Sequence, residues 1–198
     1  MSPFELFFSL FGLILGLAIA TVIGGLGDVL RERNRIRLGT LTPMLAIFVL
    51  IDLSSVWVNA WSGLSDIKVD YGPFVAASIV AAIYFFAASM VFPKVSTDWE
   101  TLDDYYITHY RWVIGGVMAA NFGLIVIQAT VDDGWASIAG AFVGTPVAAI
   151  WWATLLCLWL FRQKRVQMIG LGLLQVIWIY VLFSAWACLL YTSDAADE

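Results

Sequence analysis

Charged residues are scarce in this chain of 198 residues, and histidine and cysteine are scarcer still. Lysine, arginine, aspartate and glutamate together make up 13% of the sequence, which is about half of their usual share in a soluble domain. A soluble protein with so little charge could not cover its core with polar side chains, so the composition excludes an ordinary soluble domain. The few basic residues are spread over short loops and the net charge is −5, which excludes a basic surface for nucleic acid.

Residues that hold metals or form disulfides are equally few. The two cysteines, Cys157 and Cys188, cannot build a disulfide framework and form no CxxC pair. His109 is the only histidine in the sequence, which argues against bis-histidine haem, histidine-based metal clusters and most zinc enzymes. The sequence also contains no recognisable Ser/His/Asp or Cys/His set. We therefore expect no cofactor and no bound metal, and we expect that the protein is not an enzyme.

Apolar residues, by contrast, make up 62% of the sequence and gather in long runs. Six runs approach the roughly 20 residues needed to cross the hydrocarbon core of a bilayer. Because lipid offers the backbone no hydrogen-bonding partner, each run should be a helix. The sequence thus predicts an all-α transmembrane bundle of six helices over residues 1–187. The predicted spans are Phe4–Val29, Leu41–Leu64, Gly72–Phe92, Trp112–Val131, Ala136–Phe161 and Val166–Ala187.

The distribution of lysine and arginine predicts the orientation of these spans. Nine of the ten basic residues fall in or beside the first, third and fifth loops, and only Lys68 falls in the second. The positive-inside rule places the three basic loops in the cytoplasm. With six spans, the N-terminus and the C-terminus then both lie outside, and the lipid bilayer is the main partner of the chain.

The third predicted loop carries a helix signal of its own over residues 97–111. Thr97 and Glu100 have the spacing of a capping box, so a helix can begin at Asp98 and continue into the fourth span. Apolar and aromatic residues recur at steps of three and four at Trp99, Leu102, Tyr106 and Tyr110. We predict a short amphipathic helix at the cytoplasmic membrane interface, which is either a plain connector or a docking surface for a cytoplasmic partner.

Asp52, near the middle of the second span, is the most informative polar residue. An aspartate at a helix centre costs about 2.5–3.5 kcal/mol on insertion scales, and the acid can reduce this cost by taking up a proton. Ser55 and Asn59 follow on the same side of the helix. Such a polar stripe should face the bundle interior or a water-filled cavity, and we consider Asp52, Ser55 and Asn59 a candidate proton or cation site.

Polar residues on other spans offer Asp52 a purely structural role. A protonated Asp52 could form hydrogen bonds with neighbouring helices and hold the bundle together, as polar residues often do in membranes. The candidate partners are Asn121, Gln128 and Gln175.

Two functions therefore stay open. The first is a non-enzymatic structural, sensory or scaffolding role, with Asp52 joining helices and with another copy or a cytoplasmic protein at the third loop as partner. The second is a small proton- or cation-coupled transporter that uses Asp52, with Pro146 near the centre of the fifth span as a candidate hinge. We predict the first function and keep the second as the alternative.

Two segments resemble known sequences. The region from the first span into IDLSSVWVNAW, together with the later LDDYY, resembles a loose group of uncharacterised bacterial multi-span proteins. This resemblance implies a bacterial inner (cytoplasmic) membrane and assigns no functional residue. Residues 188–198, CLLYTSDAADE, resemble one translated frame of a sequencing-library adapter, so we exclude this tail from the predicted fold. We expect the natural sequence to be represented up to about Ala187.

Overall fold

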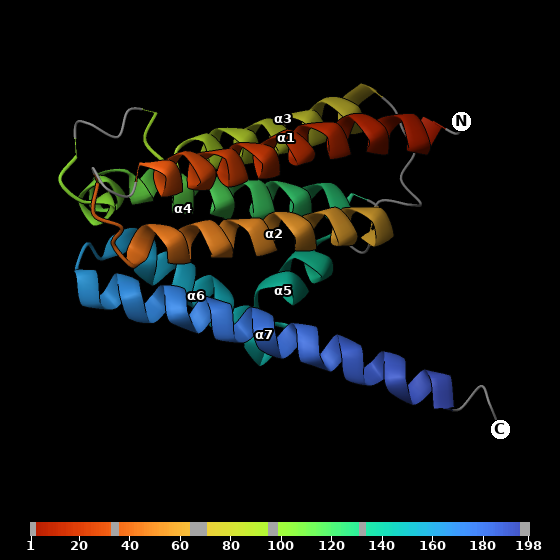
Figure 1. Cartoon of the computed structure of the whole chain (residues 1–198). Helices are drawn as coiled ribbons and strands as arrows, with labels where there is room; N and C mark the ends of the chain where they lie inside the picture. Colours follow the sequence, from red (N-terminus) through yellow and green to blue (C-terminus); the bar gives the residue numbers. More distant parts are fainter. Residues whose placement is uncertain (1–2, 33–35, 64–70, 95–98, 131–133, 195–198) are drawn as a thin grey trace.

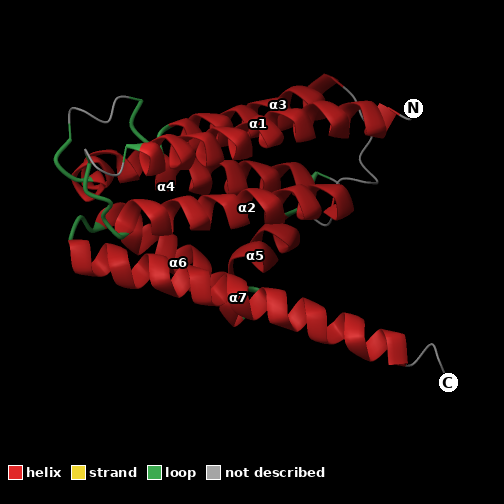
Figure 2. Cartoon of the chain, in the orientation of Figure 1, coloured by secondary structure: helices red, strands yellow, loops and turns green. Residues whose placement is uncertain are grey.

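The computed structural model of the protein describes residues 3–32, 36–63, 71–94, 99–130 and 134–194. Over these ranges the chain forms seven helices, and Figures 1 and 2 show them packed along one another. The helices are α1 (Pro3–Arg31), α2 (Leu41–Gly63), α3 (Tyr71–Ser89), α4 (Leu102–Ala129), α5 (Trp135–Val143), α6 (Pro146–Leu160) and α7 (Lys164–Asp194). The predicted all-α class is therefore confirmed.

Five of the helices are long and apolar enough to cross a membrane. They are α1, α2, α3, α4 and α7, with spans at Phe7–Arg31, Leu41–Ser62, Tyr71–Ser89, Leu102–Ala129 and Lys164–Ser184. Each of them overlaps one of the predicted spans. By length and composition, the chain is a multi-pass membrane protein.

The predicted fifth span, Ala136–Phe161, is wrong as a single helix. The chain forms two shorter helices there, α5 and α6, separated at Gly144 and Thr145. The 15 residues of α6 rise by only about 22 Å, which is less than the roughly 30 Å hydrocarbon core of a bilayer. The prediction of six continuous spans is corrected accordingly, because five described helices have the length of a span.

The break between α5 and α6 has a local cause. Thr145 is extended, with φ −131° and ψ 148°, as expected for a residue that precedes a proline. Its hydroxyl accepts a hydrogen bond from the Ala148 backbone N–H at 3.1 Å and so caps α6. Pro146 occupies the first turn, where its missing N–H costs nothing. The sequence Gly-Thr-Pro therefore ends one helix and starts another, where we expected a kink within one helix.

The helices form a bundle with the polar residues of α2 near its centre. α1 packs against α2 and α3, α4 packs against α2 and α3, and α7 packs against α2 and α6. Helices α5 and α6 both contact α4 and lie on the α7 side of the bundle (Figure 1). The last turns of α1, α3 and α6 and the first turns of α2, α4 and α7 lie at one end, on the left in Figure 1.

The helix predicted in the third loop begins later than expected. α4 starts at Leu102, and the Thr101 hydroxyl caps it by accepting a hydrogen bond from the Asp104 backbone N–H at 3.2 Å. Glu100 lies in a bend before the helix, so the predicted helix does not run through Glu100, and its predicted start, Asp98, lies outside the described residues. Thr97, the predicted cap, lies outside the described residues. Thr101 is therefore the cap of this helix, and its hydroxyl also donates a hydrogen bond to the carboxylate of Asp104.

The apolar stripe of this segment faces the protein. Leu102, Tyr106 and Tyr110 are buried in the core. The Tyr106 hydroxyl donates to the side chain of Gln167 on α7, which itself is buried. Buried tyrosine hydroxyl groups need such partners, and this one links α4 to α7. The stripe thus serves packing between helices, and the proposed interfacial position of residues 97–111 stays a prediction.

Gly39 is expected to be intolerant of a side chain, because it lies against Asp103. The Asp103 carboxylate accepts a hydrogen bond from the Leu41 backbone N–H at 3.0 Å and so caps α2. A Cβ atom at Gly39 would overlap this carboxylate. Gly39→Ala should therefore lower the free energy of unfolding by about 1–2 kcal/mol through loss of the cap, measured by denaturant titration in detergent. The matched control is Gly16→Ala, where a Cβ meets open space; equal loss in both variants would contradict the prediction.

Candidate functional site

Asp52 lies near the middle of α2 and joins three helices. Its side chain is 1% exposed. Its Oδ2 atom accepts a hydrogen bond from the Tyr84 hydroxyl of α3 at 2.8 Å and another from the Asn121 amide of α4 at 3.2 Å. The Asn121 amide also donates to the Tyr84 hydroxyl at 2.6 Å. The three side chains form a closed triangle of hydrogen bonds in the core of the bundle.

The two oxygens of Asp52 are in different situations. Both donors approach Oδ2, whereas the buried Oδ1 has no hydrogen-bonding partner in the described part of the chain. A buried acceptor without a donor is costly. The arrangement leaves Oδ1 with two chemical uses, which are to carry a proton as the acid or to meet a cation as the carboxylate.

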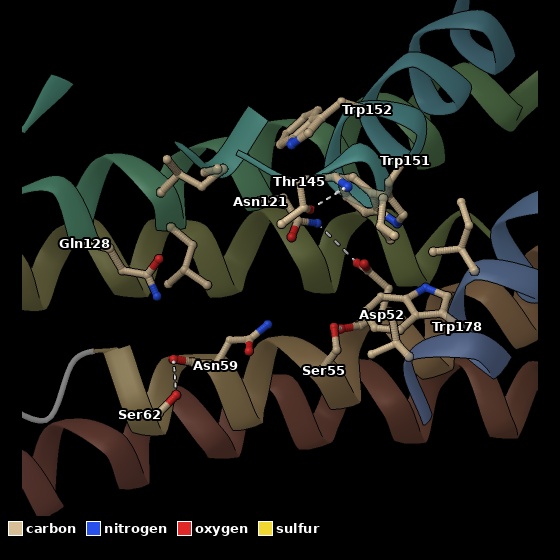
Figure 3. A pocket seen from close by; sticks show the side chains of 17 residues that line it. Asp52, Ser55, Asn59, Ser62, Asn121, Gln128, Thr145, Trp151, Trp152 and Trp178 are labelled. Atoms are coloured by element: carbon tan, nitrogen blue, oxygen red, sulfur yellow. Dashed lines mark hydrogen bonds between the residues drawn. The ribbon is translucent and has the colours of Figure 1, made fainter. Parts of the chain in front are cut away.

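A cavity of about 420 Å³ lies against Asp52. It is bounded by α2, α4, α7 and the broken pair α5 and α6 (Figure 3). Its polar lining includes Asp52, Ser55, Asn59, Ser62, Asn121 and Gln128. The polar stripe predicted on α2 therefore faces the interior of the bundle, as expected for such residues in a membrane.

The cavity is open at one end and closed at the other. Along α2, burial falls from Asp52 toward Asn59 and Ser62, which are both exposed and also line the cavity. On the opposite side of Asp52, Phe48 and Leu45 are fully packed, with at most 2% exposure. Asp52 thus lies at the bottom of a cavity that opens toward the C-terminal end of α2.

The break between α5 and α6 forms part of the cavity wall. Thr145, Val147 and Ala148 all line it (Figure 3). Pro146, the candidate hinge, is therefore placed next to the cavity, at the start of α6 rather than within a helix. A chain break beside a cavity is the setting in which irregular backbone is tolerated at membrane depth.

Two indole groups extend the site beyond the residues found from the sequence. Trp151 of α6 and Trp178 of α7 line the same cavity as Asp52. Their Nε1 atoms are buried and have no hydrogen-bonding partner among the described residues. In Figure 3 both rings lie beside the Asp52 carboxyl group. The wall of the cavity therefore contains one acceptor and two donors that have no partner within the described ranges.

The candidate partners of Asp52 divide into three cases. Asn121 contacts Asp52 directly, whereas Gln128 lines the cavity and is not among the described residues that form a hydrogen bond with the acid. Gln175 does not meet Asp52, since its amide donates to the Met44 carbonyl at 3.1 Å. The Ser55 hydroxyl is turned to its own helix and donates to the Asp52 backbone carbonyl at 2.8 Å.

Tyr84 is the main residue that the sequence analysis missed. It lies within the apolar run of α3, where a hydroxyl group cannot be satisfied by lipid. A tyrosine buried within a bundle of spans needs a partner for its hydroxyl group, and another helix can supply it. That signal was present in the sequence, but it does not tell which helix supplies the partner.

In the part of the chain that the structure describes, carboxylates and thiols do not gather into a metal site. Among the described residues, no group of three or more His, Cys, Asp or Glu side chains is placed to hold a metal ion. Asp52 is the one ionisable side chain among the described residues that line the cavity. The chemistry available there is proton exchange, hydrogen bonding and the attraction of a cation.

Comparison with protein-family models, with curated proteins and with solved structures finds no match to this chain. The function proposed below therefore rests on the geometry of the cavity at Asp52.

Proposed function

We propose that the protein is a small membrane transporter whose translocation site is the cavity at Asp52. The observation that carries this proposal is the Oδ1 atom of Asp52, which has no partner among the described residues and lies at the bottom of a cavity with one open end. An ionisable residue within a membrane is costly and usually marks a proton or ion path. A purely structural Asp52 would have no need of a cavity, because the hydrogen bonds from Tyr84 and Asn121 already join the helices.

The broken pair α5 and α6 supports this function. Transporters often build their binding sites from discontinuous helices near the middle of the bilayer. We propose that α5 and α6 cross the bilayer together, so that the chain passes through it six times. The break at Gly144 and Thr145 would then lie at the depth of the cavity, where a change of angle between the two helices can alter access.

The basic residues support an orientation for the site. The ends of α1, α3 and α6 lie together at one end of the bundle (Figure 1). Arg31 is the last residue of α1, Arg37 precedes α2, and Arg162 lies between α6 and α7. By the positive-inside rule this end is cytoplasmic. Both termini and the open end of the cavity then face the other side, in the bacterial inner membrane that the sequence resemblance implies. The described state corresponds to a site that is accessible from outside and closed toward the cytoplasm.

The different surroundings of the two Asp52 oxygens suggest that transport is coupled to a proton or a cation. Tyr84 and Asn121 donate to Oδ2 in a fixed geometry. Oδ1 is left to exchange a proton with the cavity or to bind a cation. Loss of the proton and entry of a cation would keep the net charge at the bottom of the cavity constant, which lowers the cost of moving the site between states. This coupling needs neither a cofactor nor an enzymatic step.

The experiment that tests the proposal is proton flux in liposomes. Purified protein is reconstituted with sodium and potassium salts on both sides of the membrane, so that a cation is present to exchange for the proton. The internal pH is followed with a trapped dye after an external pH step. Wild-type protein should carry protons, and Asp52→Asn should slow the flux by about tenfold or more because an amide cannot exchange a proton. The matched control is Asp28→Asn, since Asp28 is an exposed acid that is paired with Arg31 at the end of α1.

The structural role of Asp52 predicts a different result. If Asp52 only joins helices, Asp52→Asn should lower the thermal stability and leave the ion permeability of the liposomes unchanged. Wild-type liposomes with no more proton flux than protein-free liposomes would overturn proton coupling. The cytoplasmic partner at the third loop and a helix-to-helix oligomer stay as predictions that this experiment does not address.

A further inference from the structure

The two indole groups of the cavity have no role in the movement of a proton or a bare ion. Nε1 of Trp151 and Nε1 of Trp178 are buried donors, and a donor cannot coordinate a cation. A buried N–H without an acceptor is unfavourable. Tryptophan is usually kept at such a position only where its N–H can reach a partner. The two groups therefore point to something that brings an acceptor into the cavity.

The charge of the cavity constrains the same occupant. Among the described lining residues only Asp52 can carry a charge, and neither lysine nor arginine is among them. Its Oδ1 atom is an acceptor that needs a donor. A group with an N–H and a positive charge satisfies this oxygen better than a neutral group, because hydrogen bonds between charged partners are stronger.

The rest of the wall favours an organic molecule over an inorganic ion. Leu124, Ile177 and Val181 line the cavity beside the polar groups, and Trp152 adds a further aromatic ring. Sodium or potassium would need several oxygen ligands, and it would leave both indole N–H groups unsatisfied. Apolar walls with a few convergent polar groups are typical of sites for small organic ligands, and aromatic faces attract organic cations.

We propose that the cavity binds a small organic amine that also carries an oxygen acceptor, as an amino alcohol does. The protonated amine donates to Oδ1 of Asp52, and the oxygen accepts from the indole N–H groups of Trp151 and Trp178. The inference rests on the proposed function and names the cation that the transporter would carry. No covalent step is involved, and recognition depends on one charge pair and on hydrogen bonds to the two indoles.

Three probes that share a five-carbon chain test this inference by calorimetry on the purified full-length protein in detergent. 5-Aminopentanol carries both groups, pentylamine carries only the amine, and 1,5-pentanediol carries only oxygens. 5-Aminopentanol should bind about tenfold or more tightly than either of the others. Pentylamine leaves the two indole N–H groups without an acceptor, and the diol can donate to Oδ1 only from a neutral hydroxyl, which is a weaker bond than one from a charged amine. Equal binding of the three probes, or no binding of any of them, would overturn the inference.

Variants test separately the recognition of the amine by Asp52 and the recognition of the oxygen by the two indoles. Asp52→Asn should remove the preference for 5-aminopentanol over the diol, and Trp151→Phe with Trp178→Phe should remove its preference over pentylamine. Trp112→Phe is the matched control, because Trp112 is 63% exposed and lies outside the cavity. Retained preferences in the cavity variants would overturn the inference even where 5-aminopentanol binds. Native tryptophan fluorescence and thermal unfolding of each variant verify that it is folded before binding is measured.

The failures of the two proposals are distinguishable. Asp52-dependent proton flux in liposomes without amine binding would leave the transporter standing and overturn the amine as its substrate. Selective amine binding without any flux, either of protons or of radiolabelled 5-aminopentanol, would keep the binding site and overturn transport. If wild-type protein binds 5-aminopentanol selectively and takes it up into liposomes, and Asp52→Asn abolishes the uptake, both proposals are supported.

Discussion

The double variant Tyr84→Phe/Asn121→Leu is expected to lose about 3 to 5 kcal/mol of unfolding free energy, which exceeds the sum of the two single variants. Each single variant leaves Oδ2 of Asp52 with one of its two donors. The double variant removes both and leaves a buried acid without any partner in the described structure. The hydrogen bond between Tyr84 and Asn121 is lost in every case, so it cannot explain the excess.

Denaturant titration of the four proteins in detergent measures this double-mutant cycle. The control is Tyr71→Phe, because Tyr71 is 84% exposed and its hydroxyl should contribute little. Adding Asp52→Leu to the double variant removes the unpaired acid and should recover most of the lost stability, since three apolar side chains need no hydrogen bonds. Additive single effects, or a triple variant no more stable than the double, would contradict the assigned roles of Tyr84 and Asn121.

Removal of the break between α5 and α6 is expected to reduce transport to the level of protein-free liposomes. Replacing Gly144, Thr145 and Pro146 by alanine restores the missing backbone N–H and removes the cap that starts α6. Alanine favours a continuous helix by about 3 kcal/mol over proline in a helix interior. A continuous helix would fill part of the wall formed by Thr145 and Val147 and would remove the joint between the two halves.

Proton flux and thermal unfolding are measured together on this variant. We expect loss of flux from a protein that still unfolds cooperatively, at a somewhat lower temperature because a continuous helix separates the stacked rings of Phe142 and Trp152. Pro43→Ala is the matched control, because Pro43 lies in the first turn of α2, where its missing N–H has no helical partner to lose. Normal flux in the triple-alanine variant would show that the break is a packing feature and that access to Asp52 changes elsewhere.

Periodicity and composition located the helices well wherever a helix is long. Five of the predicted spans correspond to helices of span length, because a run of about 20 apolar residues has no other stable form in lipid. The error at Ala136–Phe161 arose because apolar composition cannot distinguish one helix from two. The signal for two was the dipeptide Thr145-Pro146, a cap residue followed by a proline at the first helical position.

The candidate site was also predictable in part, within one helix but not between helices. The position of Asp52 and the direction of its stripe through Ser55 and Asn59 are properties of a single helix, and the sequence alone determined them. The composition likewise determined that the chain is a multi-pass membrane protein. Tertiary structure alone decided that Tyr84 and Asn121 share Oδ2, that Gln175 turns to Met44, and that two tryptophans meet the acid across a cavity. The reason is physical: helical spacing fixes which side chains share one face, whereas contacts between helices depend on how those faces are rotated and packed together.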